Sequence, residues 1–399
     1  MRRIRRATLL GLLAGWLGLS GGLTAELSPV GGVIELPLGT FSDRPRLAAQ
    51  PSGDYVLGIS SSCVSPGEGA FYRYVAAGGN PSPVFRDWQE IGGRRYGTML
   101  GLDTITATAV GFDLVWYPCA EEPDSPKVFY RSHLDLRGKV VGRPTRLGNA
   151  DWIWQLGEDF LAGWMRPRQD AIEARRLTTS GAPAGGLLRL NSLPVKASHA
   201  RALPLAGGGF LAIWFGGLPR SNASVLRVRR FSAAGEPLGP EVDLNTLPGA
   251  LRTYSCCVDP FVVATDPYGG FAVAWILDDV LYVRFLDALG TPKGPEVEVA
   301  TSGYLGWPSS LAFDPAGNLL LLWGDLDSDL QLQLLDGSGR PLGPPRRLND
   351  ERRSEVETIL GNVAWGGDSW LVAWNAAIYP FDQGTTFFRR FADLAPASE

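Results

Sequence analysis

The feature that most constrains the fold is a repeated apolar segment that ends in tryptophan. It reads GFDLVW at 111–116, GFLAIW at 209–214 and GFAVAW at 270–275. Further copies stand at 159–164, 318–323 and 369–374, and a divergent copy at 54–59 ends in isoleucine. The copies follow one another at intervals of 48–61 residues. A period near fifty residues predicts a solenoid, a propeller or another array of one repeated supersecondary unit.

A second repeated phrase follows the apolar segment. It reads FSAAGEPLG at 231–239, LDALGTPKG at 286–294 and LDGSGRPLG at 335–343. Its Gly and Pro residues are typical of a tight turn that needs special backbone angles. Apolar residues alternate on both sides of the turn, which predicts strands rather than helices. Each unit therefore contains four short strands, the pattern of a propeller blade.

The two ends of the chain complement each other. The last unit stops after its third strand, in FFRRFADLAPASE, and the segment LSPVGGVIELPLGT at 27–40 resembles the fourth strand of a unit. We therefore expect one domain over 26–399, an all-β, seven-bladed β-propeller of four-stranded antiparallel blades. An N-terminal strand is expected to complete the last blade, which pairs the edges that an open array leaves exposed.

Residues 26–399 resemble bacterial exported seven-bladed β-propeller repeat proteins. The tryptophans that end the apolar segments and the turn from Phe231 to Gly239 carry this resemblance. The tryptophans are Trp116, Trp164, Trp214, Trp275, Trp323 and Trp374. The resemblance implies an architecture and no particular activity, because propellers host hydrolases, lyases, lectins and scaffolds alike.

The N-terminus predicts export. Six residues, MRRIRR, precede an apolar run that ends at Ala25, which is the layout of a cleaved signal peptide over 1–25. An uncleaved membrane anchor is the alternative. Removal of this segment changes the formal charge from −4 to −8, because it contains four arginines and no acidic residue. We expect a secreted or periplasmic monomer that binds neither nucleic acid nor, after cleavage, a membrane.

Four cysteines in an exported chain favour disulfides over metal thiolates. Cys63 and Cys119 follow equivalent strands of adjacent units, so we expect a bridge between them. Cys256 and Cys257 are neighbours in the chain, and their Cα atoms are closer than in most disulfides. They form either a vicinal disulfide or free thiols.

Few residue types suited to catalysis lie near the expected channel. His199, one of only two histidines, opens an innermost strand, and Asp151 and Asp259 occupy similar positions in neighbouring units. A histidine beside carboxylates is suited to general acid–base catalysis, which makes these three the candidate catalytic residues of a hydrolase or lyase. The alternative is a polar channel lining that is simply hydrated.

Candidate ligand-binding residues lie at the same end of the inner strands. Asp103 and Arg201 are placed to contact a polar or charged ligand, and Trp152 and Trp307 are placed to stack on a sugar. Packing in the core is the alternative for both tryptophans.

A possible Ca²⁺ site follows the 318–323 segment. Asp325, Asp327 and Asp329 alternate there, but the turn glycine and distal glutamate of a calcium loop are missing. A hydrated acidic rim is the alternative, and no other cofactor is predicted.

Two classes of function remain open. The loops after the tryptophan segments and between units vary in length and composition, which is typical of the binding face of a repeat array. The first class is a non-catalytic binding or interaction module that uses this face to contact a protein, a glycan or a small molecule. The second is an enzyme with its site at the mouth of the central channel.

Overall fold

The computed structural model describes most of the chain after the expected signal peptide. The described residues are 27–38, 45–59, 71–75, 85–87, 100–118, 127–166, 171–192, 196–205, 208–217, 224–246, 259–301, 305–325, 329–348, 356–378 and 383–393. Among these residues, no helix is long and apolar enough to cross a bilayer. The expected signal peptide and all four cysteines lie outside the described residues.

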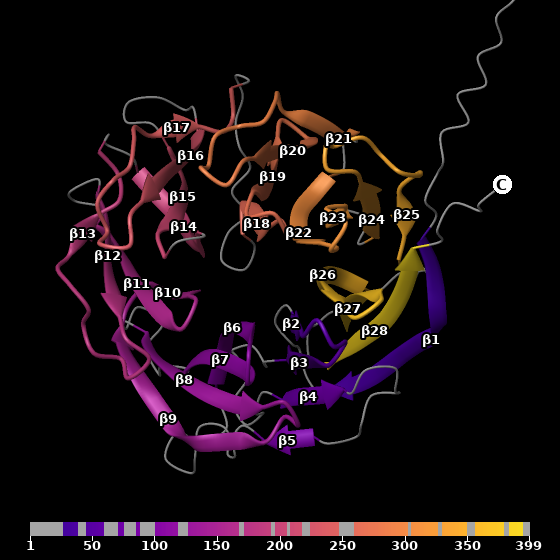
Figure 1. The fold of residues 1–399 in the computed structure, drawn as a ribbon. Helices are drawn as coiled ribbons and strands as arrows, with labels where there is room; N and C mark the ends of the chain where they lie inside the picture. Colours follow the sequence, from indigo (N-terminus) through magenta and orange to yellow (C-terminus); the bar gives the residue numbers. More distant parts are fainter. Residues whose placement is uncertain are drawn as a thin grey trace, which may run out of the picture.

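The described strands form seven four-stranded sheets, arranged around a central axis (Figure 1). Six sheets each consist of four consecutive strands, and the seventh combines the two ends of the chain in the order β1-β28-β27-β26. All neighbouring strands are antiparallel, and the first strand of each unit is innermost in the ring. The expectation of an all-β propeller is therefore confirmed.

The strands of the first three consecutive sheets are as follows. The first contains β2 (Arg46–Ala49), β3 (Tyr55–Ile59), β4 (Phe71–Val75) and β5 (Phe85–Asp87). The second contains β6 (Leu100–Thr108), β7 (Gly111–Pro118), β8 (Val128–Asp135) and β9 (Val140–Asn149). The third contains β10 (Trp152–Leu156), β11 (Asp159–Arg166), β12 (Ala171–Leu177) and β13 (Leu188–Arg189).

The remaining four sheets continue the same order. The fourth contains β14 (Lys196–Pro204), β15 (Phe210–Gly217), β16 (Ser224–Phe231) and β17 (Val242–Asp243). The fifth contains β18 (Phe261–Thr265), β19 (Phe271–Leu277), β20 (Val280–Leu286) and β21 (Val297–Thr301). The sixth contains β22 (Leu305–Phe313), β23 (Leu319–Asp325), β24 (Leu330–Leu335) and β25 (Arg346–Arg347). The composite sheet contains β1 (Leu27–Leu38), β26 (Val356–Gly366), β27 (Ser369–Ile378) and β28 (Gln383–Asp393).

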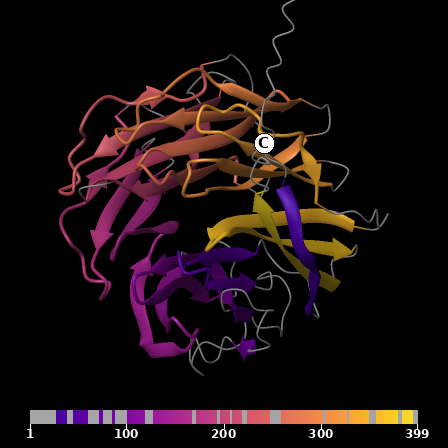
Figure 2. The same ribbon diagram turned by 45° about the vertical axis from the view of Figure 1, so that its right-hand side comes forward.

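The composite sheet joins the two ends of the described chain. β1 pairs with β28 from Leu27 opposite Asp393 to Leu38 opposite Gly384, with one irregularity between Val30 and Ile34. Figure 2 shows the indigo β1 lying beside the yellow strands of this sheet. The outer edge of the last unit is therefore covered by the first strand of the chain.

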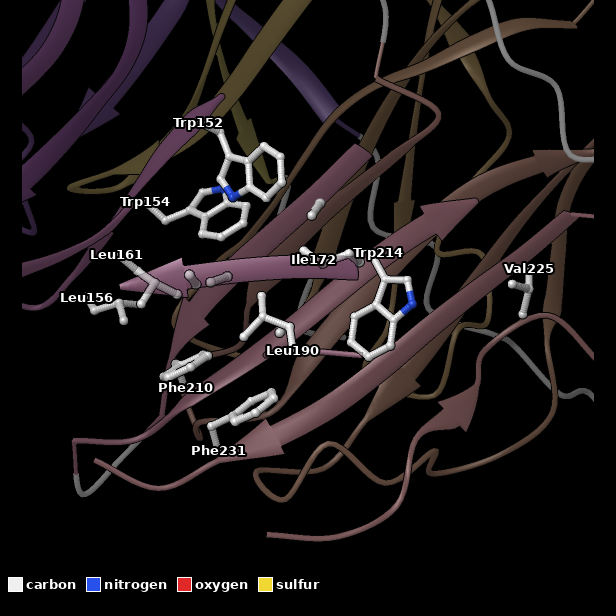
Figure 3. Close-up of a cluster of buried hydrophobic side chains, with 14 residues drawn as sticks. Trp152, Trp154, Leu156, Leu161, Ile172, Leu190, Phe210, Trp214, Val225 and Phe231 are labelled. Atoms are coloured by element: carbon white, nitrogen blue, oxygen red, sulfur yellow. The ribbon is translucent and has the colours of Figure 1, made fainter. Parts of the chain in front are cut away.

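The core lies between the sheets. Each of seven hydrophobic clusters contains buried side chains from two neighbouring sheets. In the cluster of Figure 3, Trp152 and Trp154 of β10 pack with Trp214 of β15 and Phe231 of β16. Another cluster joins Leu57 of the first consecutive sheet to Leu371 of the composite sheet. Because every junction is packed in this way, apolar burial closes the ring.

The repeated turn phrase builds the connection from the third to the fourth strand. Gly235, Gly290 and Gly339 adopt φ values of 85°, 75° and 89°, which favour glycine. In one of these turns the Asp287 carboxylate accepts hydrogen bonds from the backbone N–H groups of Leu289 and Thr291, both at 2.8 Å. The phrase recurs because each turn needs this backbone geometry.

The fourth strand of a sheet is often very short. The outer strands β13, β17 and β25 have only two residues each. The side chain of Asn245 accepts a hydrogen bond from the Leu226 N–H at 2.7 Å, and Asn191 accepts one from Ile172 at 2.8 Å. A side-chain amide thus replaces the backbone ladder where the strand would continue.

Candidate functional site

A cavity of about 290 Å³ occupies the central channel. Residues from the innermost strand of all seven sheets line it. Its polar lining includes Arg46, Asp103, Gln155, Arg201, Ser310 and Asn362. Rigid strands therefore position these side chains, as a preorganised site requires.

The register of the inner strands explains which residues reach the cavity. Ala200 lies opposite Trp214, and the next residue along β14, Arg201, lines the cavity. Asn362 likewise follows Gly361, which lies opposite Trp374. Arg201 and Asn362 therefore occupy equivalent places in their strands, one residue after the position opposite the tryptophan.

A register shift exposes Asp103 to the channel. Leu102 lies opposite Trp116 and Thr104 opposite Val115, so Asp103 is an extra residue on β6. An extra residue in one strand bends it and redirects a side chain. This irregularity places a carboxyl group in the cavity lining.

Arg201 and Asp259 form an ion pair at the cavity. Their side chains are 2.7 Å apart and partly buried. The Asp259 carboxylate raises the pKa of Arg201 above its usual value, so the guanidinium remains charged. This pair links β14 to the residues that precede β18.

Asp103 lies among several charges. Burial raises the pKa of its carboxyl group and Asp259 raises it further, whereas Arg201, Arg46 and Lys127 act to lower it. The desolvation effect is the largest of these. The cavity therefore contains groups of both signs, contributed by different sheets.

The three candidate catalytic residues have different surroundings. Asp151 is exposed, does not line the cavity, and accepts a hydrogen bond from the Met165 N–H at 2.6 Å. His199 also lies outside the cavity lining; burial lowers its pKa, while Asp259 acts to raise it. Of the three, only Asp259 lines the cavity, and it is paired with Arg201.

Only two of the four candidate ligand-binding residues line the cavity. Asp103 and Arg201 line the cavity. Trp152 is 7% exposed and packs against Trp154, with ring centroids 5.0 Å apart (Figure 3). Its indole belongs to the core between two sheets. Trp307 belongs to β22, and its side chain is outside the described structure.

The candidate metal ligands are only partly described. Asp329 forms an ion pair with Arg347 at 2.6 Å. Asp327 and the side chain of Asp325 lie outside the described residues. Within the part of the chain that the structure covers, no three His, Cys, Asp or Glu residues come together as a metal-binding group. The Ca²⁺ site remains a prediction.

Sequence reasoning missed Gln155 and Asn362 in the channel. For Asn362 a signal existed, because it occupies the place after the residue opposite a tryptophan, as Arg201 does. Gln155 lies three residues further along its strand than Trp152 and carries no comparable signal. Its position depends on Asp113 of the neighbouring sheet, to which its amide is hydrogen-bonded at 2.9 Å.

The fold and the lined channel define the class of protein as a β-propeller with a polar central cavity. No protein-family model matches the sequence, and no curated protein matches it.

Several solved structures are similar to the chain at low sequence identity. A protein of unknown function from Dyadobacter fermentans DSM 18053 is 12% identical, with a TM-score of 0.45, and the match covers 91% of this chain and all of that one. The Dos1 propeller is 10% identical, with a TM-score of 0.47, over 94% of this chain and 97% of that one. Prolyl oligopeptidase B from Galerina marginata is also 10% identical, with a TM-score of 0.44, over 91% of this chain and 48% of that one.

Proposed function

We propose that the protein is an exported, non-catalytic binding module that takes a small polar ligand in its central channel. The observation that carries this proposal is the set of charged side chains that four sheets and their leading segments bring to one cavity. These side chains belong to Arg46, Asp103, Arg201 and Asp259. Concave sites with a few convergent polar groups are the usual form of a small-molecule site.

The environment of the acidic residues supports binding over hydrolysis or elimination. A general base needs its accepting atom within hydrogen-bond reach of the substrate. The Asp151 carboxylate caps a backbone N–H away from the cavity, and Asp259 is neutralised by Arg201. Three candidate catalytic groups that do not share one pocket do not favour the enzyme alternative.

The proposed localisation is inferred from the sequence. A cleaved signal over 1–25 directs the protein to the periplasm or the medium, where it acts as a monomer. The formal charge of −8 after cleavage offers no attraction to nucleic acid or to an anionic membrane. N-terminal sequencing of the exported protein, with Glu26 as the expected first residue, tests this setting.

A thermal-shift panel tests the binding function. The panel contains neutral sugars, sugar acids, amino sugars and amino acids, each at millimolar concentration. A compound that binds only the folded ring raises the melting temperature, because binding stabilises the native state by mass action. We expect a shift from one chemical class.

A variant with a filled cavity is the matched control. Thr104 lines the channel, so Thr104→Trp occupies part of its volume. The shift is expected to disappear in this variant, provided that its unliganded melting transition remains cooperative. A shift that persists in the filled variant, or no shift from any class, would contradict the proposal.

A further inference from the structure

The charged side chains that line the cavity divide into one ion pair and two side chains without a direct partner. Arg201 and Asp259 are 2.7 Å apart, so each neutralises the charge of the other. Arg46 and Asp103 also line the cavity, and the side chain of neither forms an ion pair or a hydrogen bond with another described residue. One cation and one carboxyl group of the cavity are therefore available to a ligand.

Arg46 and Asp103 occupy corresponding places on the innermost strands of adjacent sheets. Arg46 of β2 lies opposite Gly58, the residue before Ile59. Ile59 takes the place of the repeated tryptophan in its sheet. Asp103 of β6 is the extra residue after Leu102, which lies opposite Trp116. A ligand that contacts both side chains must therefore have two groups of opposite charge close together.

Asp103 favours a cationic group on the ligand. Burial is the largest effect on the pKa of its carboxyl group and raises it, whereas the charges of Arg201 and Arg46 act to lower it. Neither arginine contacts the carboxyl group directly, and a buried carboxylate is costly without a direct partner. An ammonium group supplies such a contact, because it carries a positive charge and three N–H donors.

Arg46 favours an anionic group on the same ligand. A guanidinium presents N–H donors in a planar arrangement that matches a carboxylate. The cavity lining contains two cations, Arg46 and Arg201, and two carboxyl groups, Asp103 and Asp259. A ligand with one ammonium and one carboxylate group gives both unpaired side chains a partner and keeps this balance. A ligand with a single charge would leave one of the two side chains without a partner.

The remaining lining indicates an apolar part of the ligand. Ile105 and Leu203 line the cavity two residues after Asp103 and Arg201 on the same strands. Two residues of a strand span roughly 7 Å, so these apolar side chains lie beyond the charged ones along the channel. The volume of about 290 Å³ suits one small molecule with a charged end and an apolar end.

We infer that the channel binds a free amino acid with an apolar side chain, with its ammonium group on Asp103 and its carboxylate on Arg46. The apolar side chain of the ligand extends toward Ile105 and Leu203. This inference rests on the proposed function and names its ligand class.

Calorimetric titration with L-leucine and three analogues of the same branched skeleton tests the inference. Isocaproate lacks the ammonium group, isoamylamine lacks the carboxylate, and isocaproamide carries no charge. L-Leucine is expected to bind at least tenfold more tightly than each analogue, because only leucine gives both Arg46 and Asp103 a partner. Equal or tighter binding of any analogue, or no binding of leucine, would overturn the ligand class.

Two variants assign the contacts. Arg46→Gln is expected to reduce the preference for leucine over isoamylamine at least tenfold, because only leucine has a carboxylate to lose its partner. Asp103→Asn is expected to reduce the preference for leucine over isocaproate to a similar extent, because only leucine has an ammonium group. Arg340→Met, at a side chain 73% exposed in a turn, is the control that should bind as the wild type does. An unchanged preference in either channel variant would overturn the inference even if leucine binds.

The two proposals fail in different ways. If a sugar or a sugar acid of the thermal-shift panel binds, Thr104→Trp abolishes its binding and leucine does not bind, the channel function stands and only the ligand class is wrong. If leucine, its analogues and the whole panel fail to bind, both proposals are wrong.

Discussion

The Arg201 guanidinium lies 2.7 Å from the Asp259 carboxylate, across the junction between two sheets of the ring. The two residues are 58 positions apart in the chain, which is about one repeat. This ion pair therefore connects equivalent regions of neighbouring units at the mouth of the cavity. It also leaves Arg46 as the cavity arginine whose Nε has no partner among the described residues.

Removal of Arg201 is expected to destabilise the fold. In Arg201→Met, the partly buried carboxyl groups of Asp103 and Asp259 lose a neutralising charge, which should lower the free energy of unfolding by about 1–3 kcal/mol. Urea unfolding measures this loss. Arg340→Met removes an ion pair at a largely exposed side chain and should cost less than about 0.5 kcal/mol. Equal losses in the two variants would show that the channel pair has no special role.

Asp103 gives a pH dependence of stability with a defined sign. Burial raises its pKa above the ordinary value of 3.8, so between 3.8 and the raised pKa the folded state binds more protons than the unfolded state. The contribution of Asp103 to stability therefore falls as the pH rises through this window. Asp103→Asn should remove this fall and should be relatively more stable above the raised pKa.

Asp336 gives a pH dependence of stability with the opposite sign to that of Asp103. Burial alone would raise its pKa, but hydrogen bonds from Ser338 and Arg340 lower it below 3.8. Its contribution to stability is present above 3.8 and is lost as the pH falls below that value. Unfolding free energies of Asp103→Asn and Asp336→Asn across acidic pH should diverge from the wild type in opposite directions. Parallel curves would contradict the assigned shifts.

Gly163 is expected to tolerate no side chain. A Cβ atom at this position would lie 2.3 Å from Nε1 of Trp152, the buried residue opposite it on β10. Gly163→Ala should therefore destabilise the protein by about 1–3 kcal/mol through overpacking. Gly217→Ala is the control, since a Cβ there meets nothing within 4 Å. A neutral Gly163→Ala would mean that the tryptophan pair can move.

Glu241 and Glu296, at equivalent places just before the fourth strands of their sheets, each contact the preceding unit. Glu296 accepts hydrogen bonds from the backbone N–H and the hydroxyl of Thr246, the latter at 2.9 Å, and Glu241 holds Ser192 in the same way. Glu296→Ala should lower stability by about 1–2 kcal/mol. Glu158→Ala, at an exposed turn, should have little effect. Chemical unfolding of both variants measures the difference, and equal stabilities would contradict the role of this contact.

Much of the propeller was predictable because its signals are local. The tryptophan segments predict a buried strand in each unit, and Trp116, Trp214 and Trp275 are indeed fully buried. The turn glycines predict positive φ angles, which Gly235 and Gly290 adopt. Each of these features depends on neighbouring residues in the chain and on the period of the repeat.

The channel was less predictable because its geometry depends on contacts between units. Asp103 and Arg201 were expected near a ligand from their strand positions, and both line the cavity. The role of Gln155 depends on Asp113, 42 residues earlier in the chain, and no local pattern connects them. Trp152 was predicted to stack on a sugar, but its indole packs against that of Trp154 in the core between two sheets. The short outer strands depend on asparagine side chains that replace ladder bonds.

A crystal structure of the protein with the compound that gives the largest thermal shift tests the central claim most directly. The account predicts one bound molecule in the channel cavity, in contact with the charged side chains of Arg46, Asp103 or Arg201. A cavity that contains only water at a saturating concentration of this compound, or the compound bound elsewhere on the ring, would contradict it.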